Sequence, residues 1–328
     1  MRIHDEFDFI QKIKPQSHIH REIVTGIGDD AAVFSPEHEM NQVICVDTMV
    51  EEVHFLKNLS TPFEIGYKAL AVNISDIAAM GGFPTYFLVS IAIPPNWNEQ
   101  ELLGIYEGMK ELASQFKIDL IGGDTVSSKN QLVLTVTVMG EVEKKKHCLR
   151  SDARAGDVVF VTGTIGDSAA GLSILLNKST ASSDEVKLFL TSRHKKPKPQ
   201  VKAGRVISKL ERASLNDISD GLASELNEIA EASTKSITIY EELLPLSPEL
   251  LSLNSEERFN WALYGGEDFE LVGTTSIESF KRLSRQLESE LIKITKIGQV
   301  TDGPASVHLV RQNETIKLEK SGYNHFKR

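Results

Sequence analysis

The chain has 328 residues, 41% of them hydrophobic, and its 46 acidic and 36 basic residues give it a net charge of −10. This length and apolar content allow one long domain or two medium ones with proper cores. The acidic balance argues against a general nucleic-acid binder, which needs a basic face, although divalent cations can let an acidic protein bind nucleotides.

Cysteine usage and hydropathy bear on the compartment. Cys45 and Cys148 form no CxxC pair, which indicates a reducing environment. The first 20 residues hold charges and histidines at close intervals, so we expect no signal peptide. Apolar runs stay short of the roughly 20 residues that span a bilayer. A cytoplasmic protein without a membrane partner is expected.

The N-terminal part predicts a short amphipathic helix at 5–13 and then the glycine turn GIGDDAAVF at 26–34. Its adjacent carboxylates, Asp29 and Asp30, fit either a solvated loop or ligands of a hard cation. Residues 42–49 predict a buried strand that runs directly into Asp47, a frequent place for a ligand-facing side chain. His54 follows, and alone it fits a packed or exposed histidine.

A mostly apolar helix is predicted to start at Thr61 and to close at Gly81-Gly82, with Glu64 completing a capping box. Asp76 falls in its last turn or two, where the helix dipole disfavours a carboxylate. A metal ion or a distant basic side chain would balance this charge. A solvated carboxylate at a frayed helix end is the simpler alternative.

Further strands and a helix complete the first half. Strands are predicted at 85–93, at 118–124 with Gly123 and Asp124 at its end, and at 131–140. A capped helix runs from Asn98 to Phe116, with Tyr106 on or beside its apolar stripe. The polar, basic segment that follows predicts a domain boundary, which gives domains 1–150 and 151–328.

The second half opens with a strand at 157–163, then a glycine turn and a helix at 164–176. This turn lacks the Gly-Lys-Ser/Thr ending of a phosphate loop, so a structural turn is favoured. The basic segment 193–199 fits a solvated linker better than an anion site. Residues 213–230 predict a short strand that leads through Asp217, Ser219 and Asp220 into an amphipathic helix.

The C-terminal part places Gly-Gly-Glu-Asp, with Glu267, before a buried strand within 261–275. A helix at 277–291 and a pair of strands within 305–318 follow. The aromatic residues of the tail, 321–326, could fill a core or form a platform for a flat ligand.

Acidic residues recur at strand ends, helix ends and glycine turns, where side chains from separate elements can converge. Such a cluster would repel itself without bound cations. Many carboxylates, several glycines and no Cys/His ligand set fit Mg²⁺ with phosphates rather than zinc. The chemistry of such a site is phosphoryl transfer.

Taken together, GIGDDAAVF, VDTMVEEVHF, NISDIAAMGG, IGGDT, LRSDARAGD, DISDGLASEL, YGGEDFEL and GYNHF resemble the thiamine-monophosphate kinase family. That family belongs to the superfamily of aminoimidazole ribonucleotide synthetase and selenophosphate synthetase. The match runs in order from about residue 5 to the C-terminus. It implies an α/β (α+β type) fold of two domains, with mixed sheets flanked by helices.

The resemblance also implies ATP-dependent phosphorylation of thiamine monophosphate to thiamine diphosphate, with several Mg²⁺ ions. No side chain is expected to act as a general base. The implied Mg²⁺ ligands are Asp30, Asp47, Asp76, Asp124, Asp217 and Asp220. The implied ATP contacts are Tyr106, Gly123, Asp124, Arg150 and Ser219. The implied contacts to thiamine phosphate are His54, Glu267 and Tyr323.

By the same resemblance, the N-terminal domain pairs with its twin in a homodimer and binds Mg-ATP, and the C-terminal domain completes the nucleotide and substrate site. One departure concerns Cys45 and Val46, where many relatives carry Ser-Thr as metal ligands. Val46 has only its backbone oxygen for coordination, so that metal site is expected to be altered.

Three rivals are weaker. A selenophosphate synthetase should have a reactive Cys near its N-terminus, and none precedes Cys45. A hydrogenase-maturation relative should end in a cysteine, whereas this chain ends in Lys327-Arg328. A non-catalytic nucleotide- or metal-binding scaffold would not need so many acidic motifs.

Overall fold

The computed structural model describes residues 12–20, 22–25, 33–34, 39–253, 256–312 and 314–321. Most of the helix expected at 5–13, the turn with Asp29 and Asp30, and Tyr323 lie outside these residues. The described chain forms two compact units. One holds the residues before Ala78 together with Gly82–Lys145, and the other holds Ala78–Gly81 together with the residues from Lys146 onward.

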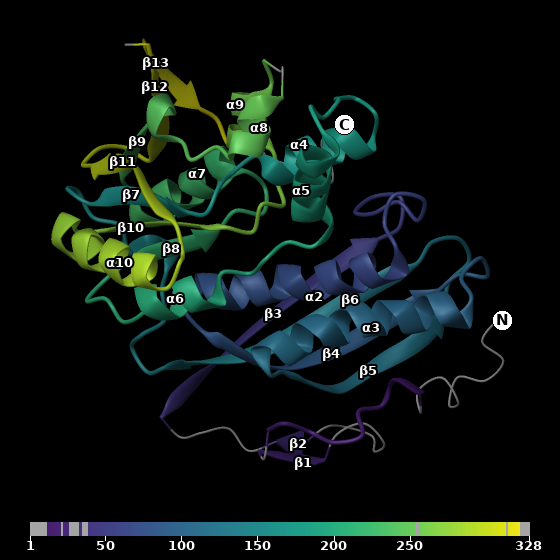
Figure 1. Ribbon diagram of the computed structural model, residues 1–328. Helices are drawn as coiled ribbons and strands as arrows, with labels where there is room; N and C mark the ends of the chain where they lie inside the picture. Colours follow the sequence, from purple (N-terminus) through teal and green to yellow (C-terminus); the bar gives the residue numbers. More distant parts are fainter. Residues whose placement is uncertain are drawn as a thin grey trace. The chain divides into compact units, whose positions relative to one another are not determined.

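The first unit is a four-stranded sheet in the order β3-β6-β4-β5, covered on one face by two long helices (Figure 1). Only β4 and β5 pair in parallel in this sheet. The strands are β3 (Met40–Val50), β4 (Phe83–Ile93), β5 (Asp119–Ser127) and β6 (Val133–Glu143), and the helices are α2 (Pro62–Ala79) and α3 (Glu99–Phe116). A separate small ladder pairs β1 (Ile23–Thr25) with β2 (Val33–Phe34).

Local sequence signals explain where both helices begin. Thr61 and Glu64 exchange hydrogen bonds between each side chain and the other's backbone N–H, which confirms the capping box of α2. Asn98 and Glu101 do the same for α3. The last turn of α2 closes through Gly81, whose N–H donates to Ala78 O and whose φ of 72° favours glycine.

The strand expected at 42–49 is present, but the prediction that it is buried is wrong. Its alternate residues face opposite sides of the sheet. Met49 faces the helices with its β6 partner Leu134, and both are buried, whereas Ile44 and Val46 are 66% and 59% exposed on the other face. Asp47 lies three residues before the end of β3, and Asp124 likewise lies inside β5 instead of at its end.

The second unit is a seven-stranded sheet in the order β13-β12-β9-β11-β7-β10-β8, antiparallel except where β12 meets β9. Its strands are β7 (Val158–Thr162), β8 (Ser214–Asp217), β9 (Ser236–Tyr240), β10 (Leu271–Thr275), β11 (Ile294–Thr301), β12 (Ser306–Arg311) and β13 (Glu314–Leu318). Its helices are α4 (Asp167–Leu175), α5 (Asp184–Lys195), α6 (Val201–Ile207), α7 (Leu222–Ser233), α8 (Pro248–Ser252), α9 (Arg258–Tyr264) and α10 (Ile277–Ser289), with short 3₁₀ turns η1 (Arg150–Asp152) and η2 (Glu241–Leu243).

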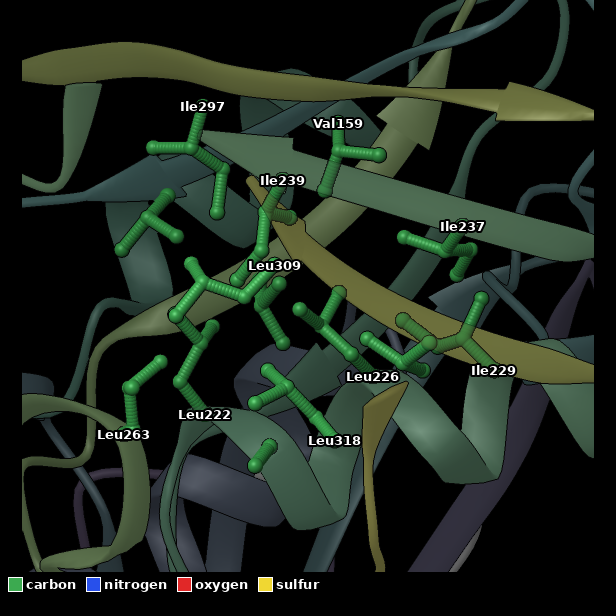
Figure 2. Close-up of a cluster of buried hydrophobic side chains, with 14 of the residues drawn as sticks. Val159, Leu222, Leu226, Ile229, Ile237, Ile239, Leu263, Ile297, Leu309 and Leu318 are labelled. Carbon is green, nitrogen blue, oxygen red and sulfur yellow. The ribbon is translucent and has the colours of Figure 1, made fainter. Parts of the chain in front are cut away.

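The core of this unit lies between the sheet and α7. Figure 2 shows Leu222, Leu226 and Ile229 of α7 among strand side chains such as Ile237 and Leu309. On the strand β7, Val159 and Val161 join this core, while the ring of the intervening Phe160 stacks on Phe280 of α10 at 6.1 Å. Helices therefore cover both faces of a mixed sheet, which confirms the predicted fold class.

Two further features of the fold bear on the sequence predictions. The segment 193–199 is not a solvated linker throughout, because Arg193 and His194 belong to α5, with His194 only 8% exposed. Among the described helices, none combines the length and apolar character that a membrane crossing requires.

Candidate active site

Two of the predicted metal ligands meet in the first unit. Asp47, on the helix-facing side of β3, has its carboxylate within hydrogen-bonding reach of Asp76, in the last turns of α2. Burial raises the pKa of Asp47, and the contacts with Asp76 and His54 partly offset this shift. Because two ionised carboxylates cannot share a hydrogen bond, the pair needs a proton or a cation. Hard oxygen donors of this kind fit Mg²⁺.

Cys45 lies on the same face of β3 as Asp47, and its thiol donates to Asn73 O at 3.2 Å. Burial, followed by the charges of Asp76 and Asp47, raises the pKa of the thiol far above its usual value. A thiol is moreover a soft donor, which suits Mg²⁺ poorly. Val46 projects from the opposite face, so its side chain does not approach the Asp47–Asp76 pair.

His54 lies in the turn that follows β3, and its ring is held by the backbone. Its Nδ1 accepts a hydrogen bond from Val50 N at 3.0 Å. An accepting Nδ1 leaves the ring proton on Nε2. The imidazole can therefore present an N–H donor beside the acidic pair.

Asp124 does not join this pair. Across the sheet, Asp124 lies in one row of paired residues with Ser90, Thr135 and Thr48. Asp47 lies in the adjacent row, with Val136 and Val89. Adjacent rows face opposite sides, so Asp124 projects from the face that α2 and α3 leave uncovered. The side chains of Asp47 and Asp124 of one chain therefore do not converge.

The other ATP-contact candidates of the first unit lie on β5 and α3. Gly123 is required sterically, because a Cβ there would come within 2.0 Å of Val89 O. Tyr106 is 9% exposed on α3, and burial raises the pKa of its hydroxyl. Its position on the buried face of α3 agrees with the expected apolar stripe.

In the second unit, Arg150 is held by a chain of hydrogen bonds. Its Nη2 donates to Asn216 Oδ1 at 3.0 Å, and Asn216 Nδ2 donates to Glu225 Oε2 at 2.5 Å. Its Nη1 forms an ion pair with Glu228 at 3.0 Å. Asn216 and Glu225 are 2% and 3% exposed. Neither residue was among the predicted site residues.

The turn between β8 and α7 carries Asp217, Ser219 and Asp220. Ser219 Oγ and Asp220 N both donate to Glu225 Oε1, at 3.3 and 3.1 Å. Burial, and next the charge of Asp217, raise the pKa of Glu225 above its usual value. The positive φ of 102° at Gly221 lets the chain enter α7 directly after these residues.

Glu267 has the left-handed φ of 67°, which is uncommon for a residue other than glycine. Its N–H donates to Ser219 O at 2.7 Å, and its carboxylate lies 3.2 Å from His194 Nδ1. The same Nδ1 lies 3.2 Å from Ser168 Oγ. A strained residue held from both its backbone and its side chain is typical of functional sites.

A buried ionic network lies next to Glu267 along the chain. Asp268 accepts hydrogen bonds from Gly166 N at 2.6 Å and Ser168 N at 3.1 Å, so the first amides of α4 serve an internal carboxylate. Arg193 pairs with Glu270 at 2.8 Å. The glycine turn before α4 is therefore structural, as the missing phosphate-loop lysine indicated.

Among the described residues, no group of three or more His, Cys, Asp or Glu side chains is arranged so that it could hold a metal ion. Asp30 and Tyr323, two further predicted site residues, lie outside the described ranges.

Comparison with known proteins assigns both halves of the chain. Residues 28–142 match the model of the N-terminal domain of AIR synthase related proteins, and residues 154–311 match that of the C-terminal domain. The chain is 53% identical to thiamine-monophosphate kinase of Bacillus subtilis (strain 168), over 98% of this chain and all of the relative. It belongs to the thiamine-monophosphate kinase family.

Other relatives agree with this assignment. The thiamine-monophosphate kinase of Escherichia coli (strain K12) is 36% identical, with 93% of each chain covered. The crystal structure of the Stenotrophomonas maltophilia K279a kinase is 34% identical, covers 92% of this chain and 94% of its own, and has a TM-score of 0.82. AaThiL, solved in complex with AMPPCP and TMP, is 32% identical, with 99% of each chain covered and a TM-score of 0.79.

Proposed function

We propose that this chain catalyses the ATP-dependent phosphorylation of thiamine monophosphate to thiamine diphosphate. Full-length identity of 53% to a thiamine-monophosphate kinase supports this function, as does similarity to a kinase that binds AMPPCP and TMP. The γ-phosphate of ATP passes directly, in line, to the phosphate of thiamine monophosphate. Catalysis then consists mainly of positioning and charge neutralisation.

Several Mg²⁺ ions belong to this proposal. The observation that carries it is the contact between Asp47 and Asp76, which needs a shared proton or a cation. Bound Mg²⁺ would neutralise the transferring phosphates. The residues proposed to hold the ions are Asp30, Asp47, Asp76, Asp124, Asp217 and Asp220.

The remaining residues bind and orient the two substrates. The proposed ATP contacts are Tyr106, Gly123, Asp124, Arg150 and Ser219, and the proposed thiamine-phosphate contacts are His54, Glu267 and Tyr323. The Nε2–H of His54 suits a phosphate oxygen, and the Glu267 carboxylate suits the cationic part of thiamine. No general base is needed, because a phosphate acceptor with a second pKa of about 6 is already ionised at neutral pH.

A homodimer is also part of the proposal. The face of the first unit's sheet opposite α2 and α3 exposes Ile44, Val46 and Val126, the last at 48%, while Ile23 covers another part of this face around Tyr86 and Met139. Monomers rarely expose extended apolar patches, and the same face of a second copy would cover it in an isologous dimer. Asp47 and Asp124 lie on opposite faces of strands three spacings apart, about 14 Å. One ion could bind both only if a second copy supplies one of them.

In this proposal the N-terminal domain (1–150) provides the dimer surface and the acidic ligands Asp47, Asp76 and Asp124. The C-terminal domain (151–328) provides the turn around Ser219 and the loop with Glu267. A cytoplasmic setting agrees with two cysteines that are both free.

The test is formation of thiamine diphosphate and ADP from thiamine monophosphate, ATP and Mg²⁺, measured by chromatography. Asp47→Asn should lower kcat at least about 100-fold, since a metal-binding carboxylate is lost. Glu52→Gln, an exposed acid five residues away, is the matched control and should stay near wild type. Full activity of Asp47→Asn would refute the proposed metal role, and a wild-type protein that forms no thiamine diphosphate would refute the function.

A further inference from the structure

Glu225 is a buried acid whose carboxylate accepts hydrogen bonds from three different residues. Its Oε2 accepts from Asn216 Nδ2, and its Oε1 accepts from Ser219 Oγ and Asp220 N. An acid that is 3% exposed is costly to bury unless its oxygens are satisfied. These contacts, from β8 and from the turn that leads into α7, satisfy both oxygens.

The direction of these bonds links Glu225 to Arg150. A guanidinium can only donate, so Asn216 must turn its Oδ1 toward Arg150. The Nδ2 of Asn216 then faces Glu225, which must accept there. Glu225 thereby holds the amide of Asn216. Asn216, together with the ion pair to Glu228, holds Arg150, whose side chain is 52% exposed.

The other oxygen of Glu225 fixes the turn. Asp220 N and Ser219 Oγ converge on Oε1 just before the chain enters α7 through Gly221. One carboxylate thus ties the turn to the Arg150–Asn216 chain.

We propose that Glu225 is the positioning residue of the nucleotide side of the site, holding Arg150 and the Ser219–Asp220 turn in one fixed arrangement. This inference rests on the proposed function, because it takes Arg150 and Ser219 as ATP contacts. Glu225 acts through these residues and does not itself need to touch ATP.

The test starts with Glu225→Gln, which keeps the shape but replaces one acceptor by an NH₂ donor. The NH₂ of the Gln must face either Asn216 Nδ2 or Asp220 N–H. Both are donors, so one hydrogen bond is lost. We expect KM for ATP to rise about tenfold or more, while KM for thiamine monophosphate changes less than about twofold. A calorimetric titration with AMPPCP should show the same loss without turnover.

A second variant restores the bond directions. The double variant Asn216→Asp, Glu225→Gln exchanges the positions of the acid and the amide. Arg150 and the NH₂ of the new Gln then both donate to the new Asp. The carbonyl of the Gln accepts from the turn, as Oε1 of Glu225 does in the wild type. The net charge is unchanged. Recovery of at least about threefold in ATP affinity over Glu225→Gln alone is expected, limited by the new carboxylate near Glu228, whose Oε2 is 3.4 Å from Asn216 Nδ2.

The matched control is Asn227→Ala on the same helix, where Nδ2 donates to Ala223 O and Leu318 O. It should lower the melting temperature and leave KM for ATP unchanged. Unchanged ATP affinity in Glu225→Gln, or a double variant no better than the single one, would overturn the inference. If the wild-type protein neither binds ATP nor forms thiamine diphosphate, the proposed function fails instead.

Discussion

Asp47 and Asp124 project from opposite faces of the same four-stranded sheet, on strands separated by two others. Both are proposed metal ligands, so their separation bears directly on how the site is assembled. One chain does not bring both to a single ion, and in the proposed dimer a second copy would supply one of them.

A mixing experiment separates a shared site from a self-contained one. Asp47→Asn and Asp124→Asn should each be inactive alone. In a mixed dimer, one site would combine the intact Asp47 of one copy with the intact Asp124 of the other. Co-refolded or co-expressed variants should therefore regain up to about a quarter of wild-type activity, since half the dimers are mixed and each has one intact site.

The control for this experiment is a variant that disrupts the proposed dimer surface. Ile44→Lys places a charge at a 66% exposed apolar position of that face and should shift the protein to a monomer in sedimentation. Mixed variants that stay inactive although they form mixed dimers would argue against a shared site.

The contact between Asp47 and Asp76 predicts a conflict between stability and activity. Asp76→Asn removes the repulsion of the pair, so in metal-free buffer its melting temperature should equal or exceed that of the wild type. Turnover should fall at least about 100-fold. The measurement is thermal unfolding with a chelator and with Mg²⁺-ATP, which should stabilise the wild type by mass action and the variant much less. A large loss of stability in the chelator would indicate a purely structural carboxylate.

Much of the fold was predictable from local patterns. The capping residues Thr61/Glu64 and Asn98/Glu101 marked the starts of α2 and α3, because each cap uses residues three apart in sequence. The sequence predicted the strand at 42–49, but it did not show that one face of this strand is exposed. An edge strand with one exposed face can have the same apolar sequence as a fully buried strand.

The site was only partly predictable. The sequence identified Asp47 and Asp76, which the structure joins, but it could not show that Asp124 faces the other side, because pairing register is set by long-range contacts. His194 was missed because its basic, Pro-containing surroundings are typical of linkers. Glu225 could have been suspected as an acid in the first turn of a helix next to the Asp217–Asp220 motif.

His194 should act on the thiamine side of the site. Its Nδ1 lies 3.2 Å from the carboxylate of the strained Glu267, so His194→Ala should let Glu267 move. KM for thiamine monophosphate should rise several-fold, about 1 kcal/mol in binding, with KM for ATP almost unchanged. Thr191→Val on the same helix, which loses the hydroxyl's bonds to Lys187 O and Leu188 O, is the control. Equal changes in both KM values would mean a general structural role.

Asp268 should make stability depend on pH. Burial raises its pKa to about 7 in the folded protein, above its usual value of 3.8. Between these two values the unfolded chain loses the proton while the folded chain keeps it, so the free energy of unfolding should fall as pH rises from about 4 to 7. Urea unfolding at pH 5, 6, 7 and 8 should show a smaller slope for Asp268→Asn. A constant difference between the two proteins over this range would contradict the assignment.

The central claim is that the γ-phosphate of ATP is transferred to the phosphate of thiamine monophosphate. Incubation with γ-labelled ATP, Mg²⁺ and either thiamine monophosphate or thiamine tests it most directly. We predict that the label appears in the terminal phosphate of thiamine diphosphate, and that thiamine is a poor acceptor because its hydroxyl would need a base to take its proton. Label found only in inorganic phosphate, or equal rates with thiamine and its monophosphate, would contradict the claim.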